Sequence, residues 1–299
     1  MMRLPATRPR LQLVAALAAV HLLWGSSYLA LKQVLSRMPA LTVTGQRALL
    51  AGLVLLALAA LRRQPRPTLA EARHAAQAGV LAVACSGSLL AEGLREADSG
   101  SSAVLFATMP IFACLFMALC GGGIHARQWA GTLLGLLGVG LLHAPSLLAA
   151  SLAGSQGLVL ASAALMALAA VAMARLRQPV SLLWASGLQL FCGGLVTCAG
   201  AWLSGEAALW PSPRVALGML YLTLVVTVCG YLAYNYLSVH GGPALATSYA
   251  YVNPPVALLL GVLCLGEPLG RGDLLAMALI LVGAALVLRA PSPSVASPS

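Results

Sequence analysis

Stretches of about 20 mostly apolar residues follow one another along most of this 299-residue chain. A helix of that length spans the hydrocarbon core of a bilayer, which is about 30 Å thick. Hydrophobic residues make up 60% of the chain and charged residues only 8%, far from the roughly 25% charged residues of soluble proteins. A soluble fold could therefore not bury all of these apolar stretches. The pattern predicts an all-α integral membrane protein with ten transmembrane helices, at residues 11–31, 41–61, 75–94, 99–120, 127–143, 157–174, 180–203, 215–237, 244–265 and 271–288.

The basic residues predict the orientation of these spans, because Lys and Arg near span ends favour the cytoplasm. With the N-terminus inside, eleven basic residues fall in cytoplasmic segments, five on the opposite face and Arg47 within a span. We therefore expect both termini in the cytoplasm. The net charge of +10 is then mostly a topology signal, and we expect no nucleic-acid binding. Sixteen arginines to one lysine indicate a GC-rich bacterial genome, hence a bacterial inner membrane.

The two halves of the chain resemble each other weakly. Residues 109–121 (MPIFACLFMALCG) align with residues 254–266 (PPVALLLGVLCLG), and the same offset places Gly138 on Gly283. Five spans are an odd number, so the second half enters the membrane in the opposite orientation. This pattern predicts two inverted five-helix repeats around a central cavity, which is the plan of many secondary transporters.

The repeat divides the chain into five segments. We expect a cytoplasmic leader at 1–10, a first repeat at 11–145, a linker at 146–156, a second repeat at 157–290 and a tail at 291–299. The leader and first span resemble a signal peptide, but the further spans favour a retained helix. The Pro/Ser-rich tail has no apolar surface to bury and is expected to be disordered.

Four stretches of the sequence resemble a known family. They are WGSSYLALK in the first span, GQRALLAG in the second, the segment around Pro110, and YVNPPVALLLGVLCLGEPLGRGDLLAMALILVGAALVL across the last two spans. Together they resemble the ten-span EamA branch of the drug/metabolite transporter superfamily. The resemblance implies a helical bundle with a central cavity that moves small metabolites or drugs, often outward. The first half departs from the family, with CGGGIHARQ in place of the Gly-Glu found at Gly266 and Glu267.

A polar stripe runs along the first span. Residues three and four apart share a helix face, so His21, Trp24, Tyr28 and Lys32 align, with Ser27 beside them. A polar face turned to lipid is costly, which predicts that His21, Trp24, Ser27 and Tyr28 line a cavity. The alternative is an interfacial aromatic belt in which Lys32 extends to the membrane surface.

The eighth and ninth spans carry similar polar faces. Tyrosine can stack on a flat substrate and still offer a hydroxyl group, whereas aromatic and small polar residues can also hold helices together. Both interpretations remain open for these residues. The candidates for the cavity are Tyr231, Tyr234, Asn235 and Tyr251.

Two charged residues fall within spans, Arg47 in the second and Glu92 near the outer end of the third. A charge at the bilayer centre costs about 2.5–3.5 kcal/mol on insertion scales, so Arg47 needs a partner or water. We expect a structural pair between Arg47 and Glu92. The alternative is that an unpaired Glu92, or else His21, binds and releases the protons that drive transport.

Other features point to packing rather than chemistry. The glycines of GTLLGLLGVG (131–140) indicate close helix contacts, and Pro254 and Pro255 indicate a bent helix. The seven cysteines and five histidines form no CxxC pair and no cluster with metal-ligand spacing, so we expect neither metal nor cofactor.

The sequence favours a secondary transporter over the other classes of membrane protein. It has no HExxH, GxSxG or phosphate-binding GxxxxGK[ST] motif, which argues against an intramembrane enzyme or an ATP-driven pump. It also has neither a ring of repeated charges nor a filter loop, which leaves a channel or a scaffold as the weaker alternative. Few buried cations argue against phosphate-rich cargo, so we expect the substrate to be a small neutral or amphipathic metabolite, such as an amino acid-like compound or a drug. The family resemblance implies outward movement, and the inverted repeats predict alternating access. The expected partners are the lipid bilayer, this substrate and protons, and the sequence leaves a homodimer open.

Overall fold

The computed structural model describes residues 7–119, 125–148, 154–174, 181–206, 212–240 and 249–289. Within these ranges every regular element is a helix, as predicted. Five of the described helices are long and apolar enough to cross a membrane, and others are apolar but shorter. The structure is therefore that of an all-helical membrane protein.

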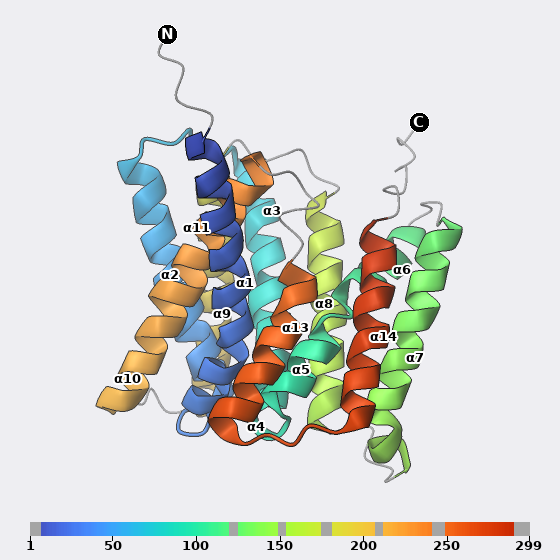
Figure 1. Cartoon of the computed structure of the whole chain (residues 1–299). Coiled ribbons are helices and arrows are strands. Elements are labelled where there is room, and N and C mark those ends of the chain that lie inside the picture. Colours follow the sequence, from blue (N-terminus) through green and yellow to red (C-terminus); the bar gives the residue numbers. More distant parts are fainter. Residues whose placement is uncertain are drawn as a thin grey trace.

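The first half of the chain contains the following elements, which run roughly along one direction of the bundle (Figure 1). Their bounds are α1 (Thr7–Leu35), α2 (Ala40–Leu61), α3 (Leu69–Gly79), the π-helical segment η1 (Val80–Gly87), α4 (Ser88–Glu96), α5 (Ser99–Phe106), α6 (Met109–Leu119) and α7 (Ala126–Leu148).

The second half repeats this plan of long and interrupted helices. Its elements are α8 (Ser155–Ala174), α9 (Leu182–Leu203), α10 (Pro213–Leu220), the π-helical segment η2 (Tyr221–Cys229), α11 (Gly230–His240), α13 (Tyr249–Leu260), the π-helical segment η3 (Gly261–Leu265) and α14 (Arg271–Leu288).

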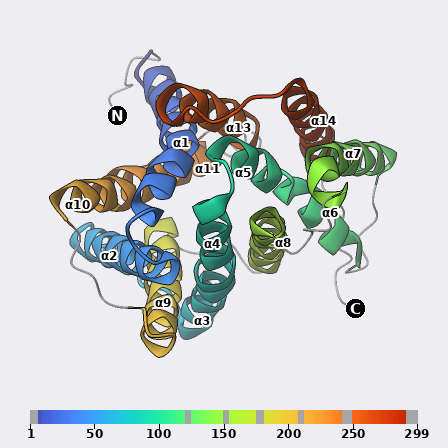
Figure 2. The same cartoon turned by 90° about the horizontal axis from the view of Figure 1, so that it is seen from below.

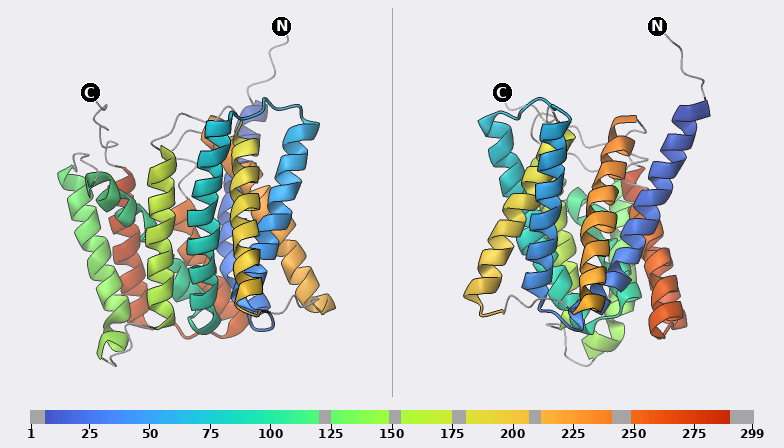
Figure 3. Two further views of the ribbon diagram at one scale, coloured as in Figure 1. Left: turned by 180° about the vertical axis from the view of Figure 1, so that it is seen from behind. Right: turned by 90° about the vertical axis from the view of Figure 1, so that its left-hand side faces the viewer.

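The most extensive contacts are made by two pairs of helices, and each pair combines one helix from the first half with one from the second. The pair α2 and α9 lies at one side of the bundle, and the pair α7 and α14 lies at the other (Figures 2 and 3). Between them, α1 packs against α11 and α13, while α4, α5 and α6 pack against α8. Helices from the two halves therefore alternate around the centre of the molecule.

Glycines allow both pairs to approach closely. A Cβ atom on Gly194 of α9 would overlap the backbone of Leu49 on α2. In the other pair, a Cβ on Gly138 would lie 2.8 Å from Ile280, and one on Gly283 would lie 2.7 Å from the backbone nitrogen of Gly135. Small residues permit such backbone contact between membrane helices. The predicted packing role of residues 131–140 is thus confirmed.

Several expected spans are interrupted. The third is a continuous helix at Leu69–Glu96 that widens into η1, and the eighth widens into η2. The expected fourth span is divided into α5 and α6 around Ala107 and Thr108, and the Thr108 hydroxyl donates to the Leu105 carbonyl at 2.6 Å. A hydroxyl that bonds back to the preceding turn competes with the regular helical pattern. Pro254 and Pro255 lie inside α13 without ending it.

Candidate functional site

A cavity of about 240 Å³ lies between the two halves of the chain. Residues from α1, α2, η1, α4, α5 and α6 line it from the first half, and residues from α8, α9, η2, α11 and α13 line it from the second. Such a volume is below the usual 300–1,000 Å³ of small-molecule pockets, so it suits a compact ligand.

One wall of the cavity is aromatic. The Trp24 ring lies 5.9 Å from Tyr231, 5.5 Å from Tyr234 and 4.6 Å from Tyr249, measured between ring centroids. Its indole Nε1 donates to the Val226 carbonyl in η2 at 3.2 Å. These contacts fix the indole as a rigid surface that joins α1 to the second half.

Polar groups face the same cavity from α2 and α13. Arg47 lines it, together with Thr44 one turn earlier on α2 and Asn253 on α13. Thr44 is 1% exposed and Asn253 is 8% exposed, yet Thr44 Oγ1 and Asn253 Oδ1 have no hydrogen-bond partner. Buried polar atoms usually have partners, so unpaired ones in a cavity wall are available to a ligand.

A pair of hydrogen-bonded serines, Ser86 and Ser162, lies at the cavity wall beside η1. Ser86 Oγ donates to the Ser162 carbonyl at 2.8 Å, and Ser162 Oγ donates to the Ser86 carbonyl at 2.7 Å. Both serines are fully buried, and Ser86 lines the cavity. This reciprocal pair joins η1 to α8, because each hydroxyl finds an acceptor on the other helix.

The structure brings together most of the residues predicted from the sequence. The cavity is lined by Trp24, Ser27, Tyr28, Arg47 and Tyr231. The ring of Tyr234 contacts Trp24 but is not among the lining residues, and His21 lies half-buried one turn before Trp24. The side chains of Asn235 and Tyr251 lie outside the described residues.

Sequence reasoning missed several residues of the site, among them Thr44, Tyr249 and Asn253. Asn253 immediately precedes the two prolines of YVNPP, so its position beside these prolines was a usable signal. Thr44 and Arg47 share a helix face at a spacing of three residues, which was also visible in the sequence. Tyr249 lies outside the stripes that the sequence analysis selected.

The expected pair between Arg47 and Glu92 is wrong. Glu92 accepts from Arg95 on its own helix, with Arg95 Nη1 3.0 Å from Glu92 Oε1. Both side chains are about half exposed at the end of α4. Residues three apart are neighbours on a helix surface, which allows this local pair to form before any contact across the bundle.

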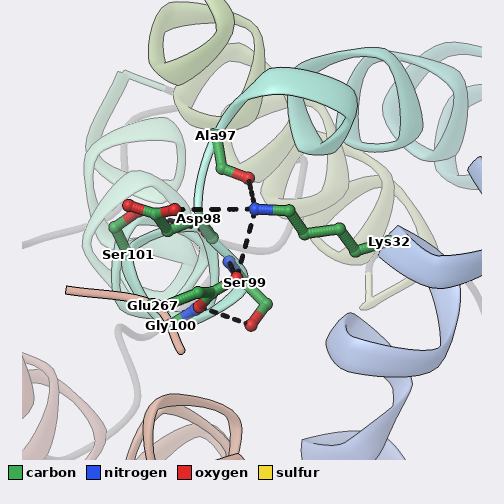
Figure 4. A network of polar contacts seen from close by, with 7 residues as sticks. All are labelled: Lys32, Ala97, Asp98, Ser99, Gly100, Ser101 and Glu267. Atoms are coloured by element: carbon green, nitrogen blue, oxygen red, sulfur yellow. Dashed lines mark hydrogen bonds and ion pairs between the residues drawn. The ribbon is translucent and has the colours of Figure 1, made fainter. Parts of the chain in front are cut away.

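The Lys32 side chain forms a polar network near the C-terminal end of α1 (Figure 4). Its Nζ donates to Glu267 Oε1 at 3.1 Å and to the Ala97 carbonyl at 2.8 Å, and lies 3.5 Å from Asp98 Oδ1. With its side chain 22% exposed, Lys32 is held by these protein contacts.

Glu267 caps the first turn of α5 from the loop before α14 (Figure 4). Its carboxylate accepts from the backbone nitrogens of Ser99 and Gly100 at 2.8 and 3.2 Å, and from the Ser99 hydroxyl at 2.8 Å. Burial alone would raise the pKa of Glu267, but the hydrogen bonds from Ser99, Gly100 and Lys32 outweigh it and lower that pKa. Glu267 therefore stays ionised and ties the two halves together at this end.

A larger groove of about 790 Å³ lies on the outer side of α1, against α10 and η2. It is more open than the central cavity, and most of its surface is apolar. A direct polar link between helices there joins Ser26 Oγ and the Tyr221 hydroxyl at 2.7 Å. The central cavity lies between the two halves and has unpaired buried polar atoms in its wall, so it is the better candidate for a ligand site. Among the described residues, no group of His, Cys, Asp and Glu could hold a metal ion.

Comparisons with known proteins agree with this architecture. YedA, an inner membrane transporter of Escherichia coli strain K12, is 34% identical over 282 residues, covering 94% of this chain and 92% of YedA. The transporter YvbV of Bacillus subtilis strain 168 is 27% identical over a match that covers 96% of this chain and 93% of YvbV. A crystal structure only 20% identical in sequence has a TM-score of 0.62 over 92% of this chain and 95% of its own, which shows the shared fold.

The model of the EamA-like transporter family matches residues 11–143 and again residues 155–289. These two matches cover nearly the whole chain and point to a transporter rather than an enzyme. Together with the relationship to YedA, they support the resemblance seen in the sequence. The chain therefore belongs to the EamA-like transporter family, within the drug/metabolite transporter superfamily.

Proposed function

We propose that this protein is a secondary transporter that moves a small neutral or amphipathic metabolite outward across the bacterial inner membrane by alternating access. The observation that carries the proposal is the cavity between the two halves, lined by Trp24 and Arg47 from one and Tyr231 from the other. Substrate sites of carriers lie at the interface between repeats, near the middle of the membrane. The relatives named as inner membrane transporters support the location.

The proposal includes ten spans in two inverted repeats, at 11–145 and 157–290. Support comes from the family model, which matches each half once, and from the π-helical segments η1 and η2, which interrupt the third long helix of each half. The helix pairs α2 with α9 and α7 with α14 also join the second and the fifth helix of one half to their counterparts. Each observation is what a two-fold relation between the halves requires.

Orientation and energy coupling are part of the same proposal. Helix α1 begins and α14 ends at the same face of the bundle (Figure 1), and the basic loops support a cytoplasmic position for that face. We infer that proton exchange drives transport, with half-buried His21 as the coupling candidate, because Glu92 is engaged with Arg95 away from the cavity.

The Lys32 network offers a physical basis for alternating access. It joins α1, the start of α5 and the loop before α14 through a single carboxylate, Glu267. A carrier that opens between its halves at this end must break these contacts, and reforming them would close that end again. Such discrete contacts suit a two-state equilibrium between open and closed forms.

Metabolite export from cells provides the first test. Cells that overexpress the protein should accumulate one or a few small metabolites outside, relative to cells that lack the gene. The same compounds should then exchange across vesicles that contain the purified protein, with saturation and counterflow. Flux that neither saturates nor shows counterflow would instead favour the channel alternative.

The driving force is tested in the same vesicles. An imposed proton gradient should accelerate flux in the wild type and not in His21→Gln, while exchange without the gradient persists in both. If the gradient has no effect on the wild type, proton coupling is wrong and the carrier proposal still stands.

A further inference from the structure

We propose that Arg47 binds a carboxylate group of the transported compound, so that the cavity selects small carboxylates with an apolar or aromatic body. This inference rests on the proposed function, since it assigns the substrate class of the same cavity. It goes beyond the structural role that the sequence suggested for Arg47.

The first step of the argument is the missing partner of Arg47. The chain has seven Asp and Glu residues, all of which lie in the described ranges. None forms an ion pair with Arg47, because the ion pairs of the described residues join Lys32 to Asp98 and Glu267, and Arg95 to Glu92.

The remaining carboxylates are also occupied or distant in sequence from the cavity wall. Glu206 accepts from the backbone nitrogen of Thr42 at 2.7 Å and so caps α2. Glu71 caps α3, and Asp273 accepts from the Gly270 nitrogen at the start of α14. Glu96 is an exposed residue at the end of α4. Arg47, a partly buried arginine that no carboxylate of the protein neutralises, is thus left for a ligand.

The chemistry of arginine specifies what that ligand carries. The guanidinium group remains protonated at physiological pH, and a desolvated cation needs an anion or strong acceptors. Its planar donors match both oxygens of a carboxylate. Phosphate-rich compounds would need several cations, whereas Arg47 is the only Lys or Arg that lines the cavity within the described residues.

Two further polar groups surround the same space. Thr44 Oγ1 and Asn253 Oδ1 are buried, unpaired and part of the cavity wall. Thr44 lies one turn from Arg47 on α2, so its hydroxyl can donate to the anion that Arg47 binds. Asn253 Oδ1, on α13, can accept from a donor such as an ammonium or hydroxyl group elsewhere on the ligand.

The other walls define the body of the compound. Trp24, Tyr231 and Tyr249 present aromatic surfaces, while Met166 and Leu190 contribute apolar ones. A volume of about 240 Å³ limits this body to the size of an amino acid side chain or a small aromatic acid. The cavity therefore combines one anion-binding group with an apolar chamber.

Binding to the purified full-length protein in detergent tests the inference directly. The probes are phenylpropionate, isocaproate and L-phenylalanine, each compared with its primary amide, which keeps the shape and removes the negative charge. We expect at least one acid to bind the wild type about 10- to 100-fold more tightly than its amide, as loss of a charged hydrogen bond implies.

Variants separate Arg47 from a general preference for anions. Arg47→Gln should remove the preference for that acid over its amide, and Thr44→Val should reduce it. Arg95→Gln is the matched control, because it removes an exposed arginine at the end of α4 and should leave the preference intact. If Arg47→Gln does not fold, the acid and amide affinities of the wild type and of Thr44→Val still test the inference.

The inference is overturned if no acid binds more tightly than its amide, or if Arg47→Gln keeps the preference. Vesicle flux of the same probes distinguishes this failure from failure of the proposed function. Saturable flux of amides with no preference for acids would leave the carrier standing and remove the role of Arg47. Tight binding of an acid without any flux would support the binding site and contradict transport.

Discussion

Trp24 illustrates how a single side chain can serve both packing and binding. Its ring contacts three tyrosines of the second half, while its Nε1 donates to the Val226 carbonyl, which lies in the π-helical segment η2. Gly230 has no Cβ, and any Cβ there would overlap the indole. These contacts already hold the indole in one orientation where it faces the cavity, which favours its role as a rigid part of the cavity wall.

We predict that Trp24→Ala and Tyr231→Ala reduce transport at least about tenfold, while the protein remains folded in the membrane, because each removes a cavity wall. Trp24→Phe should retain the surface and lose only the hydrogen bond to Val226, at a cost of about 1 kcal/mol in stability. Transport in vesicles and thermal unfolding in detergent measure the two effects. Trp202→Ala is the control, since Trp202 is 79% exposed on α9. Loss of folded protein in the alanine variants would show that these residues serve packing instead.

Glu92 provides a contrasting prediction. Its carboxylate is half exposed and pairs with Arg95, and exposed pairs contribute little to stability, typically below about 1 kcal/mol. Glu92→Gln should therefore leave transport unchanged, with or without an imposed pH gradient. If the gradient drives flux in the wild type and not in this variant, while substrate exchange persists, Glu92 is the coupling residue after all.

Helices in this protein are joined by close backbone contact and by a carboxylate from a distant loop that caps a helix. The pair α2 and α9 depends on glycines where the backbones meet, whereas α5 depends on the distant carboxylate of Glu267. Both devices satisfy or bury backbone groups that lipid cannot solvate. Two other helices widen beside the cavity, into η1 between α3 and α4 and into η2 between α10 and α11, and such π-helical segments often occur at functional sites.

Gly194→Ala should destabilise the pair of α2 and α9, because the added methyl group meets the backbone of Leu49, which cannot move aside freely. We expect a loss of about 1–3 kcal/mol, the usual cost of overpacking. Gly200→Ala on the same helix is the matched control, since nothing lies within 4 Å of a Cβ there. That control should be neutral or slightly stabilising, because alanine favours helix over glycine. Equal thermal unfolding of the two variants would contradict the packing argument.

The cap on α5 predicts a dependence of stability on pH. The pKa of Glu267 is lowered in the folded protein, so its contribution to stability is fully present above the unfolded glutamate pKa of about 4.3. This contribution should be lost as the pH falls through the lower folded pKa. The unfolding temperature of the wild type should therefore drop more steeply between about pH 5 and 3 than that of Glu267→Gln. Parallel curves for the two proteins would mean that the cap contributes nothing.

The molecule as a whole combines two halves whose surfaces meet at a cavity and are locked at one end by the Lys32 network. From the basic loops and the position of the helix ends, we propose that this locked end lies on the side away from the cytoplasm. An outward transporter in this conformation would be closed to the exterior, which is the form that loads substrate from within. Topology is thus the basis of the proposed direction of transport.

Cysteine labelling tests this topology. In a background without the seven native cysteines, Pro65→Cys should resist an impermeant maleimide in intact cells and react after the membrane is opened. Ser36→Cys, at the opposite end of α2, should react in intact cells. Both positions are exposed, so access to reagent depends on the side of the membrane. The reverse pattern would invert the orientation and the direction argued from it.

The sequence alone determined the membrane class, the helical fold, the family resemblance, the close packing at 131–140 and the aromatic stripe that includes Trp24 and Tyr28. These features depend on local periodicity and on the number of apolar residues in a window, which the chain displays before it folds. The sequence could not select partners for the charges. Glu92 pairs with Arg95 on its own helix, and Lys32 pairs with Glu267, which is 235 residues away in the sequence. Only the tertiary structure decided this, because the faces of separate helices that meet depend on how all of them pack together. The same packing left Arg47 without a carboxylate in the cavity wall, beside Thr44 and Asn253.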